Sequence, residues 1–299
     1  MLLTNVILLL LSCVPDLGLN PYPTIGAIPP PPGYHRITTH DPFTNWLRNI
    51  PLKKDRTVYL YNGSRKYNQT AQFAVLDISV GHQDLQQCAD AVMRLRAEYL
   101  YARKDYNSIC FYTGTAGSGS TEGQTSAPCG KRGKFQNALF PHKTQGVRLN
   151  FQDWSKGQRF RLSGGRLIPY SRPGSNKPCE DRACFDEYLL TVFSYCGTLS
   201  LERQLTPVAH FGDILPGDVL IRGGAPGHAM LVIDMAEDTA GHKVYLLAQS
   251  YMPAQDIHVV VNPVEGKLSP WYSIQKDPRI ITPEWTFYTS QLRRWPEKN

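Results

Sequence analysis

The sequence lacks the patterns that would place it in several common classes. It has no HExxH and no double CxxC spacing, so we expect no metal site and no cofactor. No nucleic-acid-binding motif accompanies the net charge of +7, and the Lys and Arg residues are scattered, so we expect no nucleic-acid partner. No internal repeat is visible, and no apolar run is long enough to cross a bilayer as a helix.

The overall composition is that of a folded globular protein. Hydrophobic residues make up 41% of the 299 residues, charged residues 19% and aromatic residues 11%, which argues against disorder. The length suits one large domain or two small ones. The positive net charge is weak evidence for an anionic partner such as a cell-wall polymer or a lipid surface.

The first residues resemble an export signal. Residues 1–13, MLLTNVILLLLSC, contain an apolar run of signal-peptide length and resemble a bacterial lipoprotein signal with Cys13 as the lipidated residue. Residues 14–33 include PPPPG and read as an extended tether. We expect an exported lipoprotein of the periplasm or cell surface that meets the membrane only through this anchor; the alternative is an ordinary hydrophobic N-terminal helix.

Besides Cys13 the chain has six cysteines, and an exported chain can form disulfides. Cys179 and Cys184 flank a short polar loop and are the best-placed local pair. Cys110 and Cys129 are a second candidate pair. Spacing alone decides neither pairing.

The most informative stretch runs from residue 212 to 256. Its pattern predicts a buried strand that begins at His228, a turn, and a second strand that ends near Gln249. With the turn centred between residues 238 and 239, His228 faces Gln249, whose amide can orient the imidazole of a general base. A register slip would substitute Ser250 or Ala248, and Asp256 is an alternative orienter.

A helix that carries Cys88 is predicted upstream. A strand over residues 73–80 ends in a glycine, and Asp84 is the expected N-cap of the helix that follows. Cys88 then falls in the first turn, where the helix dipole lowers a thiol pKa and unpaired amides can bind an oxyanion. A free cysteine also commonly packs as a small buried hydrophobe, so a structural role stays open.

Three other segments bear on the site. Trp154 and Arg159 lie in a segment that is predicted to line a cleft and contact substrate. Residues 66–69, KYNQ, are polar among strand patterns and are interpreted either as the border of a cleft or, preferably, as a solvated hairpin end. Residues 113–133 are rich in Gly, Ser and Thr and are a candidate lid or insertion.

The order of these motifs resembles the NlpC-type peptidases of the papain-like superfamily. The shared features are a cysteine opening a helix (Cys88), a PGD turn at residues 216–218, and a GH pair at residues 227–228 that starts a strand. The resemblance implies a single α+β domain over residues 34–299, with an antiparallel sheet packed against the cysteine-bearing helix. It also implies peptidoglycan stem peptides as the substrate.

A second resemblance covers most of the chain, from about Gly33 to the C-terminus. The runs that carry it resemble the uncharacterised bacterial family called domain of unknown function 4846; they are WLRNIPLK, VYLYNGSRKYNQTAQFAVLDISVG, QQCADAVMRLRAEYLYA and PGHAMLVIDMA followed by LLAQSYMPAQDIHV. This family carries no established activity, so the resemblance identifies relatives without naming a reaction.

We therefore carry two functions forward. The first is a Cys-His hydrolase or acyltransferase that acts on a cell-envelope substrate, with Cys88 as nucleophile, His228 as base and Gln249 as orienter. The second is a non-catalytic module that binds an envelope glycan or peptide. An active pair requires the Cys88 sulfur within about 4 Å of an imidazole nitrogen, whereas a buried Cys88 would exclude catalysis.

Overall fold

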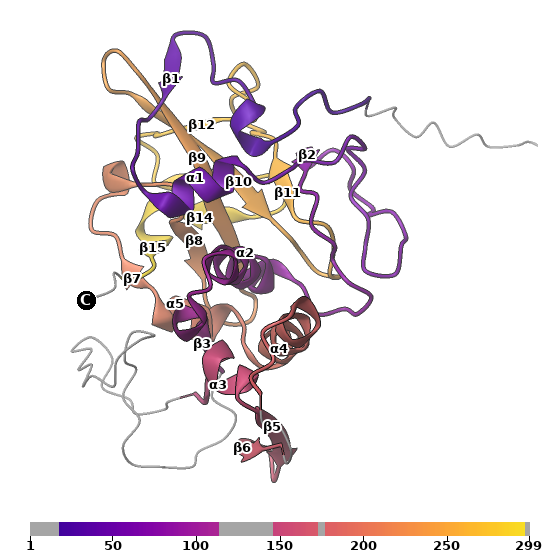
Figure 1. Cartoon of the computed structure of the whole chain (residues 1–299). Coiled ribbons are helices and arrows are strands. Elements are labelled where there is room, and N and C mark those ends of the chain that lie inside the picture. Colours follow the sequence, from indigo (N-terminus) through magenta and orange to yellow (C-terminus); the bar gives the residue numbers. More distant parts are fainter. Residues whose placement is uncertain (1–17, 114–145, 173–176, 297–299) are drawn as a thin grey trace, which may run out of the picture.

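The computed structural model describes residues 18–113, 146–172 and 177–296 (Figure 1). At its centre is a nine-stranded antiparallel sheet, so the predicted α+β class and antiparallel sheet are confirmed. Along the sheet the strands run in the order β2-β11-β10-β9-β8-β15-β7, while β1 pairs with β9 and β12 with β10. The strands of this sheet are β1 (Tyr34–Arg36), β2 (Gln72–Val75), β7 (Thr206–Pro207), β8 (Val219–Arg222), β9 (His228–Asp238), β10 (Lys243–Gln249), β11 (His258–Val260), β12 (Tyr272–Ser273) and β15 (Leu292–Arg294).

Helices and three small two-stranded sheets surround this sheet. The α-helices of the described residues are α1 (Pro42–Arg48), α2 (Cys88–Ala102), α3 (Phe151–Ser155), α4 (Arg182–Tyr195) and α5 (Thr198–Gln204). The small sheets pair β3 (Cys110–Tyr112) with β4 (Arg148–Asn150), β5 (Gln158–Ser163) with β6 (Arg166–Ser171), and β13 (Arg279–Ile281) with β14 (Thr286–Tyr288). Helix α2 packs against β9 and β10 and therefore lies at the sheet's centre (Figure 1).

Strand β9 is buried on both faces, which explains why its sequence is a continuous apolar run. Ala229, Leu231 and Ile233 belong to the larger hydrophobic cluster, together with the apolar residues of α2. Met230 and Val232 belong to a second cluster with β14. Side chains of a strand alternate between faces, so the sheet separates the two clusters.

One buried charge ties the N-terminal segments to this strand. The Asp234 side chain is fully buried, and each of its oxygens accepts a 2.7 Å hydrogen bond, one from Arg36 and one from Arg48. A buried carboxylate is tolerated only when it is paired in this way. The ion pairs therefore fix β1 and α1 against β9.

Two predicted boundaries were wrong. Strand β2 ends at Val75, and Asp77 beyond it is exposed. Helix α2 begins at Cys88, with Gln87 as N-cap in a capping box completed by Asp90. Asp84 is not the cap: its carboxylate accepts a 2.6 Å hydrogen bond from the Ala254 amide, a long-range contact that a local pattern cannot reveal.

The predicted register of the central hairpin was also wrong. Ala248 pairs with Leu231, and the register shifts by one between Leu246 and Leu247. The turn lies after Asp238, where the amide of Asp238 donates to the carbonyl of His242. The turn is therefore centred on Ala240 rather than between residues 238 and 239, and the bulge adds one residue to one strand.

The local disulfide pair is confirmed, since Cys179 and Cys184 are bonded. Cys110 is also disulfide-bonded, but Cys129 lies outside the described residues. Cys88 and Cys196 carry free thiols.

Candidate functional site

The structure brings His228 and Gln249 together at the end of β9 and β10. The Nε2 atom of His228 lies 2.8 Å from the Oε1 atom of Gln249, and both residues are buried. Neither of the alternative partners, Ser250 and Ala248, contacts His228 in place of Gln249. The Ser250 hydroxyl donates to backbone carbonyls, and Ala248 has no polar side-chain atom. The predicted contact is therefore present, although the two residues do not face each other in the ladder.

The surrounding bonds fix the orientation of the Gln249 amide. Its Nε2 group donates to Oε2 of Glu284 at 2.8 Å and lies 3.3 Å from Nε2 of His258. The Nδ1–H of His258 donates to the backbone carbonyl of Asp256 at 2.9 Å, which leaves Nε2 as the acceptor. Gln249 Oε1 then points at His228, whose Nε2 carries the proton and whose Nδ1 keeps its lone pair.

A buried ion pair completes this network. The ammonium group of Lys66 lies 2.6 Å from Oε2 of Glu284, and both side chains are largely buried. Lys66 is therefore buried rather than solvated, in contrast to the sequence interpretation, whereas Tyr67 beside it is fully exposed. We call Lys66, His228, Gln249, His258 and Glu284 the polar network.

Burial decides the protonation of its titratable groups. Burial lowers the pKa of His228 to about 4. The hydrogen bond to Gln249 raises this pKa and so offsets the effect of burial only in part. Burial also lowers the pKa of His258 to about 3, and that of Lys66 below its usual value against the opposing effect of Glu284. At neutral pH both imidazoles are therefore uncharged, and His228 is a neutral lone-pair acceptor.

Cys88 is the first residue of α2, as expected, but its thiol is not activated. Only 8% of the residue is exposed. Burial, followed by the nearby Asp90 carboxyl, raises the pKa of the thiol to about 11, and a hydrogen bond from the Ala229 amide opposes this only in part. Burial raises the pKa of Asp90 as well. The expectation of a helix dipole that lowers the thiol pKa is corrected, because desolvation dominates here.

No hydrogen bond joins the Cys88 thiol to an imidazole in the described part of the chain. The ring of His228 instead stacks among aromatic side chains, with centroids 4.8 Å from Tyr251, 5.3 Å from Trp285 and 5.7 Å from Phe287. Asp256, the alternative orienter, does not bond to His228; its carboxylate binds Lys53 at 2.9 Å and the Tyr59 amide at 3.0 Å.

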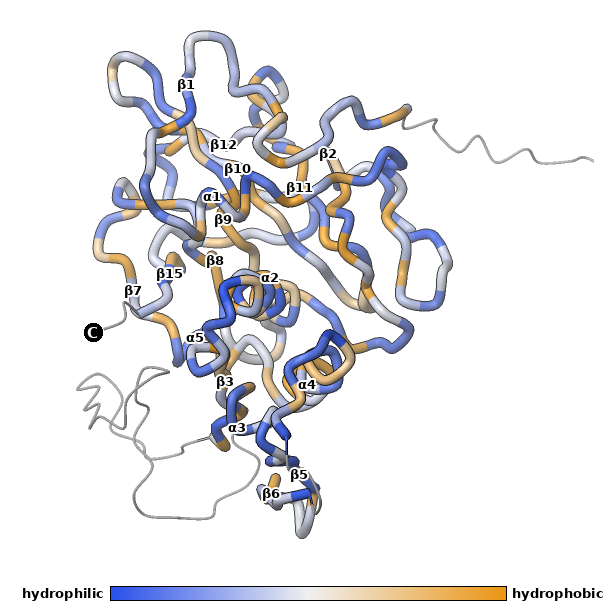
Figure 2. The backbone as a smooth tube through the Cα atoms, viewed as in Figure 1, coloured by the Kyte–Doolittle hydropathy of each residue, from blue (hydrophilic) through white to orange (hydrophobic). Residues whose placement is uncertain are grey.

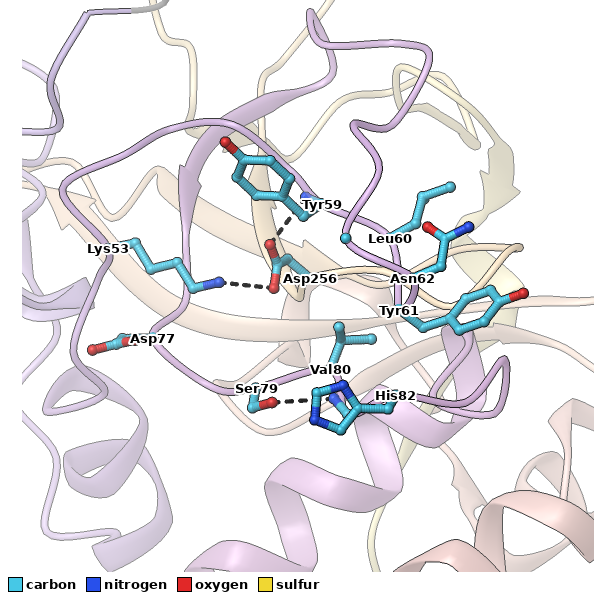
Figure 3. A pocket seen from close by; sticks show the side chains of 12 residues that line it. Lys53, Tyr59, Leu60, Tyr61, Asn62, Asp77, Ser79, Val80, His82 and Asp256 are labelled. Atoms are coloured by element: carbon cyan, nitrogen blue, oxygen red, sulfur yellow. Dashed lines mark hydrogen bonds and ion pairs between the residues drawn. The ribbon is translucent and has the colours of Figure 1, made fainter.

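An open groove adjoins the polar network at Asp256, whose backbone carbonyl accepts the hydrogen bond from His258; Figure 3 shows its lining residues. Its volume is about 570 Å³. One wall is the loop of Tyr59–Gly63 and the other the loop that follows β2, from Asp77 to His82. Figure 3 shows Lys53 and Asp256 between these loops, bound to each other. We call this the Asp256 groove; its lining residues are Lys53, Tyr59, Leu60, Tyr61, Asn62, Gly63, Asp77, Ser79, Val80, Gly81, His82 and Asp256.

Exposure differs sharply within the Asp256 groove. Asp256 is 2% exposed and forms the base, whereas the side chains of Asn62, Asp77 and His82 are exposed. The Tyr61 ring is partly exposed, and its amide donates to the Ala254 carbonyl at 2.9 Å. The groove therefore combines a rigid base with accessible polar and aromatic groups.

The other predicted site residues lie elsewhere. Trp154 is 3% exposed, with the Arg159 guanidinium 3.9 Å from its ring centroid. Arg159 itself is buried, donates to the Trp154 carbonyl and pairs with Glu187. Both belong to the packing of α3 against β5, and neither lines the Asp256 groove. Cys13 lies outside the described residues.

Sequence reasoning missed three members of the polar network: Lys66, His258 and Glu284. Lys66 had a signal, since a polar run stood among strand patterns. Glu284 had no such signal in the sequence, because its partner Lys66 is 218 positions away. His258 could have been found from its place on β11, where it pairs with Gln249.

Within the described residues, no three His, Cys, Asp or Glu side chains are grouped so as to hold a metal ion, and no helix there is long and apolar enough to span a membrane. A family model described as "Domain of unknown function (4846)" matches residues 26–121 and 131–294. No curated protein and no solved structure matches the chain.

Proposed function

We propose a function from the geometry of this chain, which belongs to the family described as domain of unknown function 4846. The function is that of a binding module that holds a sugar of a cell-envelope polymer in the Asp256 groove. One contrast carries the proposal: the groove exposes its polar and aromatic groups, whereas the Cys88 thiol is buried with a pKa of about 11.

The chemistry of the groove suits a neutral polyhydroxylated ligand. Sugar hydroxyls both donate and accept hydrogen bonds, and the groove offers an amide at Asn62, a carboxylate at Asp77 and an imidazole at His82. The Tyr61 ring supplies an apolar face with a polar tip, which suits the axial C–H groups of a pyranose. Specific pockets commonly combine such surfaces with a few placed polar groups.

The charges of the groove also favour a neutral ligand. Lys53 is paired with Asp256, whose second oxygen accepts from the Tyr59 amide. The charges at the floor of the groove therefore neutralise each other, and a ligand does not need a charge of its own to bind there. Asp77 is exposed and remains available as an acceptor for hydroxyl groups.

Isothermal titration with soluble N-acetylhexosamine oligosaccharides tests the proposal. We expect binding in the micromolar to millimolar range, weakened about tenfold in Tyr61→Ala, because loss of a stacking ring removes about 1 kcal/mol or more. Asp77→Asn should weaken it less, since the amide still accepts. Tyr288→Ala is the matched control, since Tyr288 is half-exposed outside the groove. Equal affinity in wild type and Tyr61→Ala, or no binding at millimolar sugar, would refute the proposal.

A Cys-His hydrolase of papain-like fold is the second candidate; the burial of Cys88 counts against it, but its hydrogen-bond geometry is in favour. The Gln249 amide holds His228 with an unprotonated Nδ1, which is the state required of a general base. Cys88 starts a helix, and its sulfur accepts a hydrogen bond from the residue after His228. This function requires Cys88 to react rapidly at neutral pH in a manner that depends on His228. If Cys88 reacts slowly and its rate does not depend on His228, the hydrolase is refuted and binding is the one function that remains.

A further inference from the structure

The β5–β6 hairpin projects from the end of the molecule away from the central sheet (Figure 1). Six residue pairs form its ladder, from Gln158 with Ser171 to Ser163 with Arg166. Gly164 and Gly165 make the turn with φ of +56° and +73°, which suits glycine. Phe160 and Leu167 anchor the hairpin to the main hydrophobic cluster, so the outer part is held in place while remaining accessible.

The hairpin carries positive charge only. Residues 156–172 contain five basic residues and no acidic residue; the basic ones are Lys156, Arg159, Arg161, Arg166 and Arg172. Arg159 is buried and paired with Glu187, whereas Lys156, Arg161 and Arg172 are exposed. The nearby carboxylate of Asp153 is paired with Arg148. An anionic surface is therefore the electrostatic complement of the hairpin.

Exposed apolar side chains accompany this charge. Leu162 is 61% exposed, Ile168 38% and Tyr170 43%. Ile168 stands opposite Arg161 in the ladder, and the Arg161 guanidinium lies 6.0 Å from the centroid of the Tyr170 ring. Figure 2 shows hydrophobic and hydrophilic positions together along the hairpin. A nucleic acid or a soluble polyanion has no use for exposed aliphatic groups, but a bilayer buries them beneath its headgroups.

We propose that the β5–β6 hairpin docks on a lipid bilayer that contains anionic headgroups. Arg161 and Arg172 contact the phosphates, and the exposed basic side chains are drawn towards the surface potential. The hairpin enters edge-on, so that Leu162 on one face and Ile168 on the other both reach the boundary between headgroups and acyl chains. Tyr170 lies at headgroup level, as aromatic rings with a polar tip do at membrane interfaces. This contact involves neither the Asp256 groove nor an N-terminal lipid, and it would orient the domain on the membrane.

Vesicle co-sedimentation tests this contact. The probe is the full chain with Cys13→Ser, which cannot carry a lipid at that position, mixed with vesicles of 30% phosphatidylglycerol in phosphatidylcholine or of phosphatidylcholine alone. We expect stronger partitioning into the anionic vesicles, reduced by 500 mM salt because surface potentials are screened. Equal partitioning into both vesicle types would overturn the proposal.

Hairpin variants locate the contact. Arg161→Gln with Arg172→Gln should weaken partitioning about thirtyfold, since each basic residue near an anionic surface contributes a factor of about five. The matched control is Lys267→Gln with Lys276→Gln, two exposed lysines far from the hairpin in the sequence. This variant should change the partitioning less than twofold. Leu162→Ser with Tyr170→Ser should weaken partitioning while leaving the charge unchanged. Partitioning equal to that of the wild type in either hairpin variant would overturn the proposal. Partitioning that depends on the arginines but not on Leu162 and Tyr170 would also overturn it, because that result indicates a soluble polyanion as the partner.

Discussion

Iodoacetamide should alkylate Cys88 far more slowly than an exposed thiol of the same chain at neutral pH. The reagent reacts with the thiolate, and the pKa of Cys88 is about 11 against an ordinary 9.0. At pH 8 the thiolate fraction of Cys88 is therefore about a hundredfold smaller than that of an ordinary cysteine. The 8% exposure of Cys88 slows the reaction further.

The assay compares Cys88 with an engineered reference. Ser64→Cys places a thiol on an exposed loop, and mass spectrometry of the digested chain follows both sites in one sample. Between pH 8 and 10 the rate at Cys88 should rise about a hundredfold, because the thiolate fraction grows tenfold per pH unit below the pKa. The reference should level off above pH 9.

His228→Ala supplies the decisive comparison. No hydrogen bond joins His228 to the Cys88 thiol in the described residues, so the variant should not slow alkylation. Labelling of Cys88 below pH 7 that is faster than the reference and collapses in His228→Ala would refute the reasoning. It would show a thiolate–imidazolium pair and make hydrolysis the leading function.

Three further outcomes follow from the buried polar groups and one tight turn. The folded-state pKa values of His228 and His258, about 4 and about 3, lie below the ordinary 6.5, so stability is fully present above pH 6.5 and is lost as pH falls towards 4. The loss is about 3 kcal/mol for His228 by urea unfolding, and His258→Gln should reduce the slope. Glu284→Gln leaves Lys66 buried without a counter-ion and should cost about 3–5 kcal/mol, which a cost below 1 kcal/mol would contradict. Gly227→Ala places a Cβ 2.4 Å from both a carbonyl and a hydroxyl oxygen and should lower the free energy of unfolding by about 1–3 kcal/mol; unchanged stability by thermal melting would contradict that packing.

The candidate site shows how far a sequence pattern reaches. The contact between His228 and Gln249 was predictable, because two strands joined by a short turn bring their far ends together. The register was not, since the turn is centred on Ala240 rather than between residues 238 and 239, and neither this position nor the bulge between Leu246 and Leu247 leaves a mark in the hydrophobic pattern. The contact survives the shift because the long Gln249 side chain reaches diagonally across the ladder.

Helix α2 illustrates the same limit. Its apolar periodicity predicted the helix and put Cys88 in its first turn, but its N-cap lies three residues later than predicted. Local capping rules favoured Asp84, which the tertiary structure uses to bind the Ala254 amide instead.

By itself, the sequence determined the α+β class, the antiparallel hairpin and the helix that carries Cys88, and it marked Cys179 and Cys184 as the best-placed cysteine pair. Each of these depends on residues close together in the chain, whose periodicity and spacing can be read directly. Only the tertiary structure decided that Cys88 is buried beside Asp90, that Lys66 meets Glu284, and that Asp256 forms the base of a groove. These features depend on depth of burial and on partners up to 218 positions apart, and burial is what sets the pKa values on which the chemistry depends.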